Sequence, residues 1–404
     1  MESSIDASRV KGLTLNKRLM FGTRFFIELK SLNAVIQIFY LSRGLDLGQM
    51  VFLSLVWSLV AFVCDVPSSF LADKYGRKKL IIVGIFLTAI STFLLFFAHG
   101  FAFFTLTYII AAAGYSFFMG ADHALLYDSL KEVGEEPSAT RVAGKYFSSQ
   151  SLPKIVVPFI GSFIARGLLP WQFMILIGID LAGSIVSMIL AGFLTEPKVE
   201  KIQAEKLNLL KEGFKLIRSD KTLFKMALNK ITVFQAAFVY WRVSQIFLKD
   251  AGLPIIFLGA IYTVFQGILF LMFWNTEKVQ RWVGKINFLT YPPILGFIAI
   301  TLSLLTTNLY ILFFCCVVLL TVGTIRDPLF LSVMQARIPS FNRATAISTL
   351  NTIKNIIDVP ILLTVGYLAK IDIHYVLVTA GILFLIPIVF MRIGKEDLNV
   401  YNDK

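Results

Sequence analysis

The chain has 404 residues, of which 57% are hydrophobic and 16% are charged, and its mean hydropathy is +0.76. This composition excludes an ordinary soluble domain and indicates an integral membrane protein with room for roughly a dozen transmembrane helices. The net charge of +13 indicates basic loops in contact with anionic lipid headgroups rather than nucleic-acid binding.

The N-terminal region gives no sign of a cleavable signal peptide. The first 18 residues are polar, and the apolar run that follows is long and is interrupted by Glu28 and Lys30. We therefore expect the N-terminus to stay in the cytoplasm.

Apolar runs then continue along the whole chain. They predict an all-α membrane protein with twelve spans, near residues 19–41, 47–71, 79–98, 102–130, 142–166, 169–194, 223–248, 254–276, 286–305, 308–335, 343–369 and 373–392. With the N-terminus inside, the cytoplasmic segments carry about 25 Lys and Arg residues against about 4 outside. This asymmetry predicts a multi-pass protein of the plasma (inner) membrane with both termini in the cytoplasm.

The longest polar interruption lies between the sixth and seventh spans. It divides the chain into an N-terminal six-helix bundle (1–194), a cytoplasmic linker (195–222) and a C-terminal six-helix bundle (223–404). Apolar residues recur in the linker at helical spacing and predict an amphipathic helix on the cytoplasmic surface: Leu209, Leu210, Phe214 and Ile217.

The spacing of several residues indicates that the two bundles are an internal repeat. Gly44 stands 32 residues before Gly76, and Gly252 stands 32 residues before Gly284. Further landmarks correspond in the same order: Gly120, Arg141 and Pro158 with Gly323, Arg343 and Pro360. Two parallel six-helix repeats follow from this match.

The loop between spans two and three reads LADKYGRKK and includes Asp73, Gly76 and Arg77. With the twelve spans and the central linker, it resembles the loop signature of the major facilitator superfamily, G-x-x-x-D-[RK]-x-G-R-[RK], except that Ser69 replaces the first glycine. The resemblance covers nearly the whole chain. It implies two pseudo-symmetric six-helix bundles that move a solute by alternating access, with spans one, four, seven and ten lining the cavity and spans two, five, eight and eleven beside them.

The same loop has a physical interpretation of its own. A tight turn at Gly76 would let Arg77 fold back toward Asp73, and Asp128 at the end of span four would complete a charge cluster that holds the cytoplasmic side closed. Asp65, which precedes Pro67 in the kinked part of span two, is either part of this gate or structural. The neighbouring lysines are expected to be topological anchors.

Intramembrane polar residues are the candidates for function, because each is costly in hydrocarbon. Proton carriers need a carboxylate or a histidine, and the candidates are Asp122 with His123, then Glu28, Asp327 and Asp358. The predicted cavity residues are Lys30, Asn33, Gln37, Gln150, Lys154, Gln235, Arg242, Arg326, Asn351, Lys354 and Asn355. Helical spacing places Lys30, Asn33 and Gln37 on one stripe of span one, with Arg24 and Glu28 on another, and aligns Tyr146, Gln150 and Lys154 on span five. The alternative is that these charges neutralise one another, as Lys354 and Asp358 do if they share a helix turn. Asp180 in span six has no explanation beyond a buried hydrogen bond.

This mixture of charges predicts a small polar or charged cargo and coupling to protons. Antiporters of the superfamily often carry G-P-x-x-G-G in span five, and Pro158 and Gly161 keep part of it, which favours export. Ordinary helix packing explains the same two residues equally well. The alternatives are a proton-coupled importer of an anionic or zwitterionic metabolite or siderophore, and a lipid flippase of the same fold.

Other classes of protein fit less well. The sequence has no nucleotide-binding glycine loop, no nucleophile elbow and no metal-ligand spacing, and its three cysteines, Cys64, Cys315 and Cys316, lie in apolar runs without CxxC spacing. We therefore expect no enzyme activity, no cofactor and no metal. The expected partners are a small-molecule substrate, protons and membrane lipids, with the chain acting as a monomer.

Overall fold

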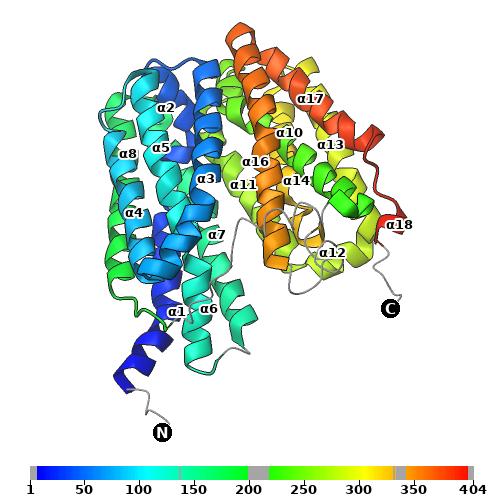
Figure 1. Cartoon of the computed structure of the whole chain (residues 1–404). Coiled ribbons are helices and arrows are strands. Elements are labelled where there is room, and N and C mark those ends of the chain that lie inside the picture. Colours follow the sequence, from blue (N-terminus) through cyan, green and yellow to red (C-terminus); the bar gives the residue numbers. More distant parts are fainter. Residues whose placement is uncertain (1–6, 136–137, 199–217, 331–332, 334–342, 399–404) are drawn as a thin grey trace. The chain divides into compact units, whose positions relative to one another are not determined.

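The computed structural model describes residues 7–135, 138–198, 218–330, 333 and 343–398 (Figure 1). Within these ranges it leaves out some side chains, among them those of Asp65, Asp73 and Asn351. The described residues are all-helical, with loops and turns between the helices and no strand among them. The chain divides into two compact units, one of Met1–Gly44 with Val56–Gln203 and one of Leu45–Leu55 with Ala204–Lys404. The predicted linker helix around Leu209 and Phe214 lies outside the described residues.

Unit 1 is built around α1 (Ala7–Ile27), which packs against the later helices of the same unit. Its other elements are η1 (Ser31–Ala34), α2 (Ile36–Ser42), most of α3 (Leu47–Tyr75), α4 (Arg77–Leu94), α5 (Gly100–Met119), α6 (Asp122–Glu132), α7 (Ala139–Ile164), η3 (Ala165–Gly167) and α8 (Pro170–Gly192). Close packing of α4 on α5 depends on Gly84 and Gly114, because a Cβ on either would lie 2.7 Å from the other's carbonyl oxygen.

Unit 2 repeats this plan around α10 (Lys221–Asp250). Its other helices are α11 (Ile255–Trp274), α12 (Thr276–Val283), α13 (Lys285–Leu305), α14 (Leu309–Thr324), α16 (Arg343–Ile371), α17 (Ile373–Val389) and α18 (Lys395–Leu398). Asp220 starts α10 by accepting the backbone N–H groups of Thr222 and Leu223 at 2.9 and 3.0 Å.

An asparagine ties the first long helix of each unit to the end of its last apolar helix. In unit 1, Asn16 donates to the carbonyl of Thr195 at 2.8 Å and accepts from the Thr195 N–H at 2.9 Å. In unit 2, Asn229 donates to the carbonyl of Met391 at 2.9 Å. Both contacts satisfy backbone groups at a helix end.

Eight helical segments among the described residues are long and apolar enough to cross a membrane: Leu47–Cys64, Gly100–Glu132, Pro170–Gly192, Lys221–Asp250, Ile255–Trp274, Lys285–Leu305, Leu309–Phe330 and Thr352–Ile371. The structure also has helices at the four other predicted spans. These helices are not counted among the eight for three reasons. α4 and α7 contain several basic residues, α17 has only 17 residues, and the helix at the first predicted span is broken. The protein is therefore a multi-pass helical membrane protein, and the count of twelve spans stays a prediction.

The predicted continuous helix over 19–41 is wrong. α1 ends at Ile27, and the chain passes through an irregular segment at 28–30 into the short η1 and then α2. A carboxylate from a distant helix caps this break, as described below. Lys30, Asn33 and Gln37 therefore do not form the single helical stripe that the continuous helix predicts.

The fourth and tenth predicted spans are also interrupted. Turn residues at 120–121 separate α5 from α6, and turn residues at 325–326 follow α14. Gly120 lies at the first interruption, where a Cβ would come within 2.7 Å of the Ser68 hydroxyl in α3. The glycine at this turn thus allows α3 a close approach.

Candidate functional site

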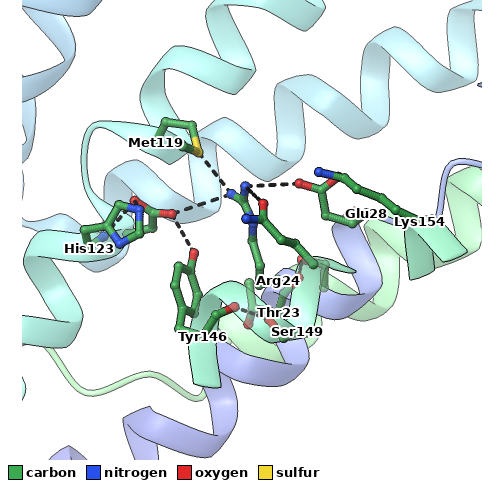
Figure 2. Close-up of polar contacts among 11 residues, drawn as sticks. Thr23, Arg24, Glu28, Met119, His123, Tyr146, Ser149 and Lys154 are labelled. Atoms are coloured by element: carbon green, nitrogen blue, oxygen red, sulfur yellow. Dashed lines mark hydrogen bonds and ion pairs between the residues drawn. The ribbon is translucent and has the colours of Figure 1, made fainter. Parts of the chain in front are cut away.

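A buried arginine is the centre of the polar site in unit 1 (Figure 2). Arg24, near the end of α1, is 5% exposed. Its Nη2 donates to Gln150 Oε1 at 2.6 Å and lies 3.1 Å from Glu28 Oε1, while its Nη1 lies 3.6 Å from Asp122 Oδ2. Arg24 therefore joins three elements, α1, α6 and α7, through one guanidinium group.

Asp122 is the buried end of this cluster. Its side chain is fully buried, and its Oδ2 accepts a hydrogen bond from the Tyr146 hydroxyl at 2.5 Å. The Oδ1 atom accepts the N–H of His123 at 2.6 Å and lies 3.9 Å from His123 Nε2. Because α6 begins at Asp122, its first N–H groups also favour a negative charge there.

Glu28 is the more accessible carboxylate of the cluster. Its side chain is 16% exposed, and its Oε2 lies 3.3 Å from Lys154 Nζ, whose side chain is 38% exposed. Arg24 and Lys154 thus hold Glu28 from two sides. With Asp122, the cluster has two carboxylates and two cations, so it is close to neutral while His123 is neutral. Gain of a proton by either carboxylate would leave a net positive charge to be compensated.

Span five supplies three of these side chains at regular spacing. Tyr146, Gln150 and Lys154 follow one another at intervals of four residues on α7, so they lie on one face of the helix. They reach Asp122, Arg24 and Glu28 respectively. The face predicted from the sequence is confirmed as a structural arrangement.

The break in span one is stabilised by Asp180 of α8. Its Oδ1 accepts from the Ser31 N–H at 2.6 Å and from the Ser31 hydroxyl at 2.8 Å, and its Oδ2 accepts from the Leu32 N–H at 3.3 Å. These are the N–H groups at the start of η1, which a continuous helix would pair with its own carbonyls. Gly161 of α7 approaches from another side, where a Cβ would overlap the Ser31 carbonyl oxygen. Glu28 is the first residue of this break.

Another charge cluster of unit 1 lies where α3 meets α4. Arg77 forms an ion pair with Asp128 of α6 and donates to the carbonyl of Ala124. The predicted approach of Arg77 to Asp128 is therefore present, whereas the side chains of Asp65 and Asp73 lie outside those described. The gating role of all these residues, and of Gly76, stays a prediction.

Glu196, which was not predicted from the sequence, also contacts the junction of α3 and α4. Glu196, just after α8, accepts the N–H groups of Arg77 and Lys78 at 2.6 and 2.7 Å. It thereby caps α4 at the turn made by Gly76, whose φ is +101°. A Cβ on Gly76 would lie 3.1 Å from the Glu196 carboxylate, so a glycine suits both the backbone and the contact.

Arg9 connects the start of α1 to α6 and to the segment after α8. It donates to both Glu132 oxygens, at 2.6 and 3.1 Å, and to the carbonyl of Glu196 at 3.0 Å. The hydrogen bonds to Glu132 raise the pKa of Arg9 above its ordinary value. Lys198 N–H donates to Glu132 as well, at 2.7 Å. The residues that follow α8 are therefore fixed to α1, α4 and α6.

Arg326 is the buried cation of unit 2. It is 2% exposed, and its Nη1 donates to Asn229 Oδ1 and to the Leu289 carbonyl, both at 2.9 Å. That carbonyl is available because Pro293, four residues later in α13, has no N–H to bind it. Asp327 instead pairs with Lys230, at 3.4 Å. Neutral acceptors therefore hold Arg326.

Span eleven contains a local ion pair. Lys354 donates to Asp358 Oδ2 at 2.9 Å within one turn of α16, and Asp358 is fully buried. Lys354 also lies 5.4 Å from the centre of the Phe234 ring on α10. This is the mutual neutralisation that the sequence left open as an alternative.

α10 contributes a polar and aromatic face. Arg242 lies 3.9 Å from the Phe238 ring centre, and Trp241 donates to the Tyr262 hydroxyl. Gln235 is fully buried, and neither its Oε1 nor its Nε2 has a hydrogen-bond partner among the described residues. A buried amide without partners is rare in folded proteins.

The structure thus brings five predicted residues together in unit 1: Glu28, Asp122, His123, Gln150 and Lys154. In unit 2 the predicted residues form separate groups around Arg326 with Asp327, Lys354 with Asp358, and the α10 face with Gln235 and Arg242. Lys30 directly precedes η1, Asn33 lies in η1 and Gln37 in α2, so all three lie at or beyond the break in span one. Asn355 lies on α16 beside Lys354, and the Asn351 side chain lies outside those described. Arg24, Glu196 and Asn229 were not predicted as site residues. Only Arg24 had a local signal, its spacing of four residues from Glu28.

Comparison with known proteins gives consistent results. The family model described as Major Facilitator Superfamily matches residues 20–359. A bacterial homologue of the human lysosomal transporter Spinster, solved facing inward and unoccupied, has a TM-score of 0.73 at 15% identity, with 98% of each chain covered. The nucleoside transporter NupG has a TM-score of 0.73 at 14% identity, with 94% of this chain and 98% of that chain covered. At these identities the two likenesses establish the fold. No curated protein matches the sequence.

Proposed function

Because the chain belongs to the major facilitator superfamily, and is therefore a membrane transporter of small molecules, we propose that it is a proton-coupled secondary transporter of a small polar or charged solute. It would work by alternating access of two six-helix bundles, which is the twelve-span arrangement that the sequence predicts. Its expected location is the plasma membrane, with both termini in the cytoplasm.

The Arg24 cluster is the observation that carries this proposal. Buried charges in a membrane protein are retained where they bind an ion or a solute, and this cluster places a partly accessible carboxylate between two cations. We propose Glu28 as the coupling carboxylate. Asp122, which is fully buried and already bonded to Tyr146 and to the His123 N–H, would hold Arg24 in place.

A proton on Glu28 would change what the cluster binds. The neutral carboxyl would lose most of its attraction for Arg24 and Lys154, and both cations would then be available to an anionic group of the cargo. The protonation state of one residue would in this way control the affinity for the solute.

We propose export as the direction, because Pro158 and Gly161 keep part of the antiporter pattern in span five; in an exporter, the proton on Glu28 would compete with a cationic group of the cargo for the carboxylate. A second candidate is proton-coupled import of an anionic or zwitterionic metabolite. The Glu28 geometry favours it, since a proton on Glu28 and an anion on Lys154 would bind together and move in the same direction.

The proposal is tested in two steps. Purified protein is first screened by thermal unfolding against charged metabolites and drugs, since a bound solute stabilises the folded state. The stabilising solutes are then tested in proteoliposomes with an imposed pH gradient of either polarity. Transport that the gradient drives supports proton coupling, and the polarity that drives accumulation separates export from import. Transport indifferent to the gradient would refute the coupling.

A further inference from the structure

Unit 2 contains a cavity of about 740 Å³ that the transport cycle proposed above does not use. It lies where the first turns of α13 meet the end of α17, and we call it the α13/α17 pocket. Ile286, Ile294 and Ile388 supply apolar wall, whereas Tyr291, Arg392 and Lys395 supply polar groups. The pocket therefore has an apolar part and a basic part.

Its charge is of one sign. Arg392 and Lys395 are both exposed, and no carboxylate is among the described residues that line the pocket. The nearby Asp397 is 6% exposed and is already bonded to Lys225, at 2.6 Å, and to the Gly394 N–H, at 2.8 Å. The positive charge of the two pocket residues is thus left for a ligand.

Two further features favour an anion at this place. α13 begins at Lys285, beside the pocket, and the N–H groups of its first turn have no carbonyl partners within the helix. Behind the pocket wall, the buried Arg326 donates to neutral acceptors on two lining residues, Asn229 and Leu289. Both features add positive potential at the polar end.

Apolar surface leads away from the pocket along both helices. α13 exposes large apolar side chains at helical spacing, and so does α17: Tyr291, Ile294, Leu295, Ile298 and Leu302 on the first, and Val378, Ile382, Leu385 and Val389 on the second. In a multi-pass membrane protein such stripes face lipid. They end at the pocket, where Arg392 and Lys395 begin the polar C-terminal segment.

We propose that the α13/α17 pocket binds the phosphate-bearing headgroup of an anionic phospholipid, with its acyl chains on the apolar stripes of α13 and α17. A water-soluble anion would match the basic residues but not the apolar wall or the stripes. A zwitterionic lipid would match the stripes but would carry no net charge for Arg392 and Lys395. The site does not depend on the proposed coupling at Glu28.

The test uses full-length protein in detergent, titrated with phosphatidylglycerol or phosphatidylcholine of the same chain length and followed by native mass spectrometry. We expect preferential binding of phosphatidylglycerol and about tenfold weaker binding by the double variant R392Q/K395Q. The matched control is K221Q/K278Q, which also removes two exposed positive charges from unit 2 but none from the pocket. It should bind like the wild type.

A second variant keeps the test independent of charge and of the folding of R392Q/K395Q. Ile388→Trp fills the pocket with apolar volume and should weaken phosphatidylglycerol binding at unchanged net charge. An excess of inorganic phosphate should displace little lipid. The proposal is overturned if R392Q/K395Q and Ile388→Trp bind phosphatidylglycerol as tightly as the wild type. Displacement of the lipid by millimolar inorganic phosphate would overturn it too, because the pocket would then be a site for free anions.

Discussion

Asp180 holds Ser31 through two hydrogen bonds, one to its backbone N–H at 2.6 Å and one to its hydroxyl at 2.8 Å. A third bond, to the Leu32 N–H, completes the cap of η1. One carboxylate of α8 thus stabilises the break in span one, and Glu28, at the start of that break, lies beside Arg24 and Lys154.

Replacement of Asp180 should therefore destabilise unit 1. Asp180→Ala removes three acceptor contacts and leaves buried donors on Ser31 and Leu32, at a cost of about 3 kcal/mol in the free energy of unfolding. Asp180→Asn keeps one acceptor oxygen and should cost less. Thermal unfolding in detergent measures both, with the exposed Asp250→Asn as the control. An Asp180→Ala variant as stable as the wild type would contradict the cap.

The turn at Gly76 gives a prediction with a control inside the repeat. Gly76→Ala places a Cβ at a φ of +101° and 3.1 Å from the Glu196 carboxylate. Gly284→Ala meets similar backbone strain, at a φ of +86°, but its nearest neighbour is 3.9 Å away. Both should lose about 1 kcal/mol or more through strain. Gly76→Ala should lose more, and equal losses in thermal unfolding would argue against the Glu196 contact.

Loss of the Arg77–Asp128 pair should impair transport rather than folding. Arg77→Gln removes one partner of an ion pair whose side chains are 11% and 18% exposed. If the pair holds one state of the transport cycle closed, Arg77→Gln should abolish transport while membrane insertion and monodispersity stay close to the wild type. Lys79→Gln, an exposed neighbour, is the control. Transport by Arg77→Gln at the wild-type rate would refute the gating role of the Arg77–Asp128 pair.

Gln235 allows stability and function to be separated. Because its buried amide has no partner among the described residues, Gln235→Leu should raise the unfolding free energy by about 1 kcal/mol. If Gln235 binds solute, the same change should lower transport. Gln245→Leu is the control, since Gln245 is equally buried on α10 but donates to Tyr262, at 3.4 Å. A less stable Gln235→Leu with normal transport would count against both parts of the prediction.

The sequence predicted the parts of the site that local spacing determines. Tyr146, Gln150 and Lys154 follow helical periodicity on an unbroken part of α7, so their common face was visible in advance. The same rule assigns Lys30, Asn33 and Gln37 to one stripe, and it fails there because α1 stops at Ile27. Asp180, about 150 residues away, caps the segment after this end, and no local pattern encodes such a contact. The role of Glu196 could not be predicted from a local pattern for the same reason, since the helix that it caps begins far upstream at Arg77.

Pro293 illustrates a signal that sequence could have supplied. A proline inside a span releases the carbonyl four residues before it, and that carbonyl needs a donor. In unit 2 the donor is Arg326, from outside α13. The need for a donor was predictable, whereas its identity required the fold.

The most direct measurement compares two modes of transport in the Glu28→Gln variant, with a solute identified by the thermal screen. A coupling carboxylate is needed for accumulation driven by a pH gradient, but not for exchange of labelled against unlabelled solute across the membrane. We predict that Glu28→Gln keeps exchange and loses gradient-driven accumulation, whereas Glu135→Gln, a control outside the cluster, keeps both. Gradient-driven accumulation by Glu28→Gln at the wild-type level would contradict the account.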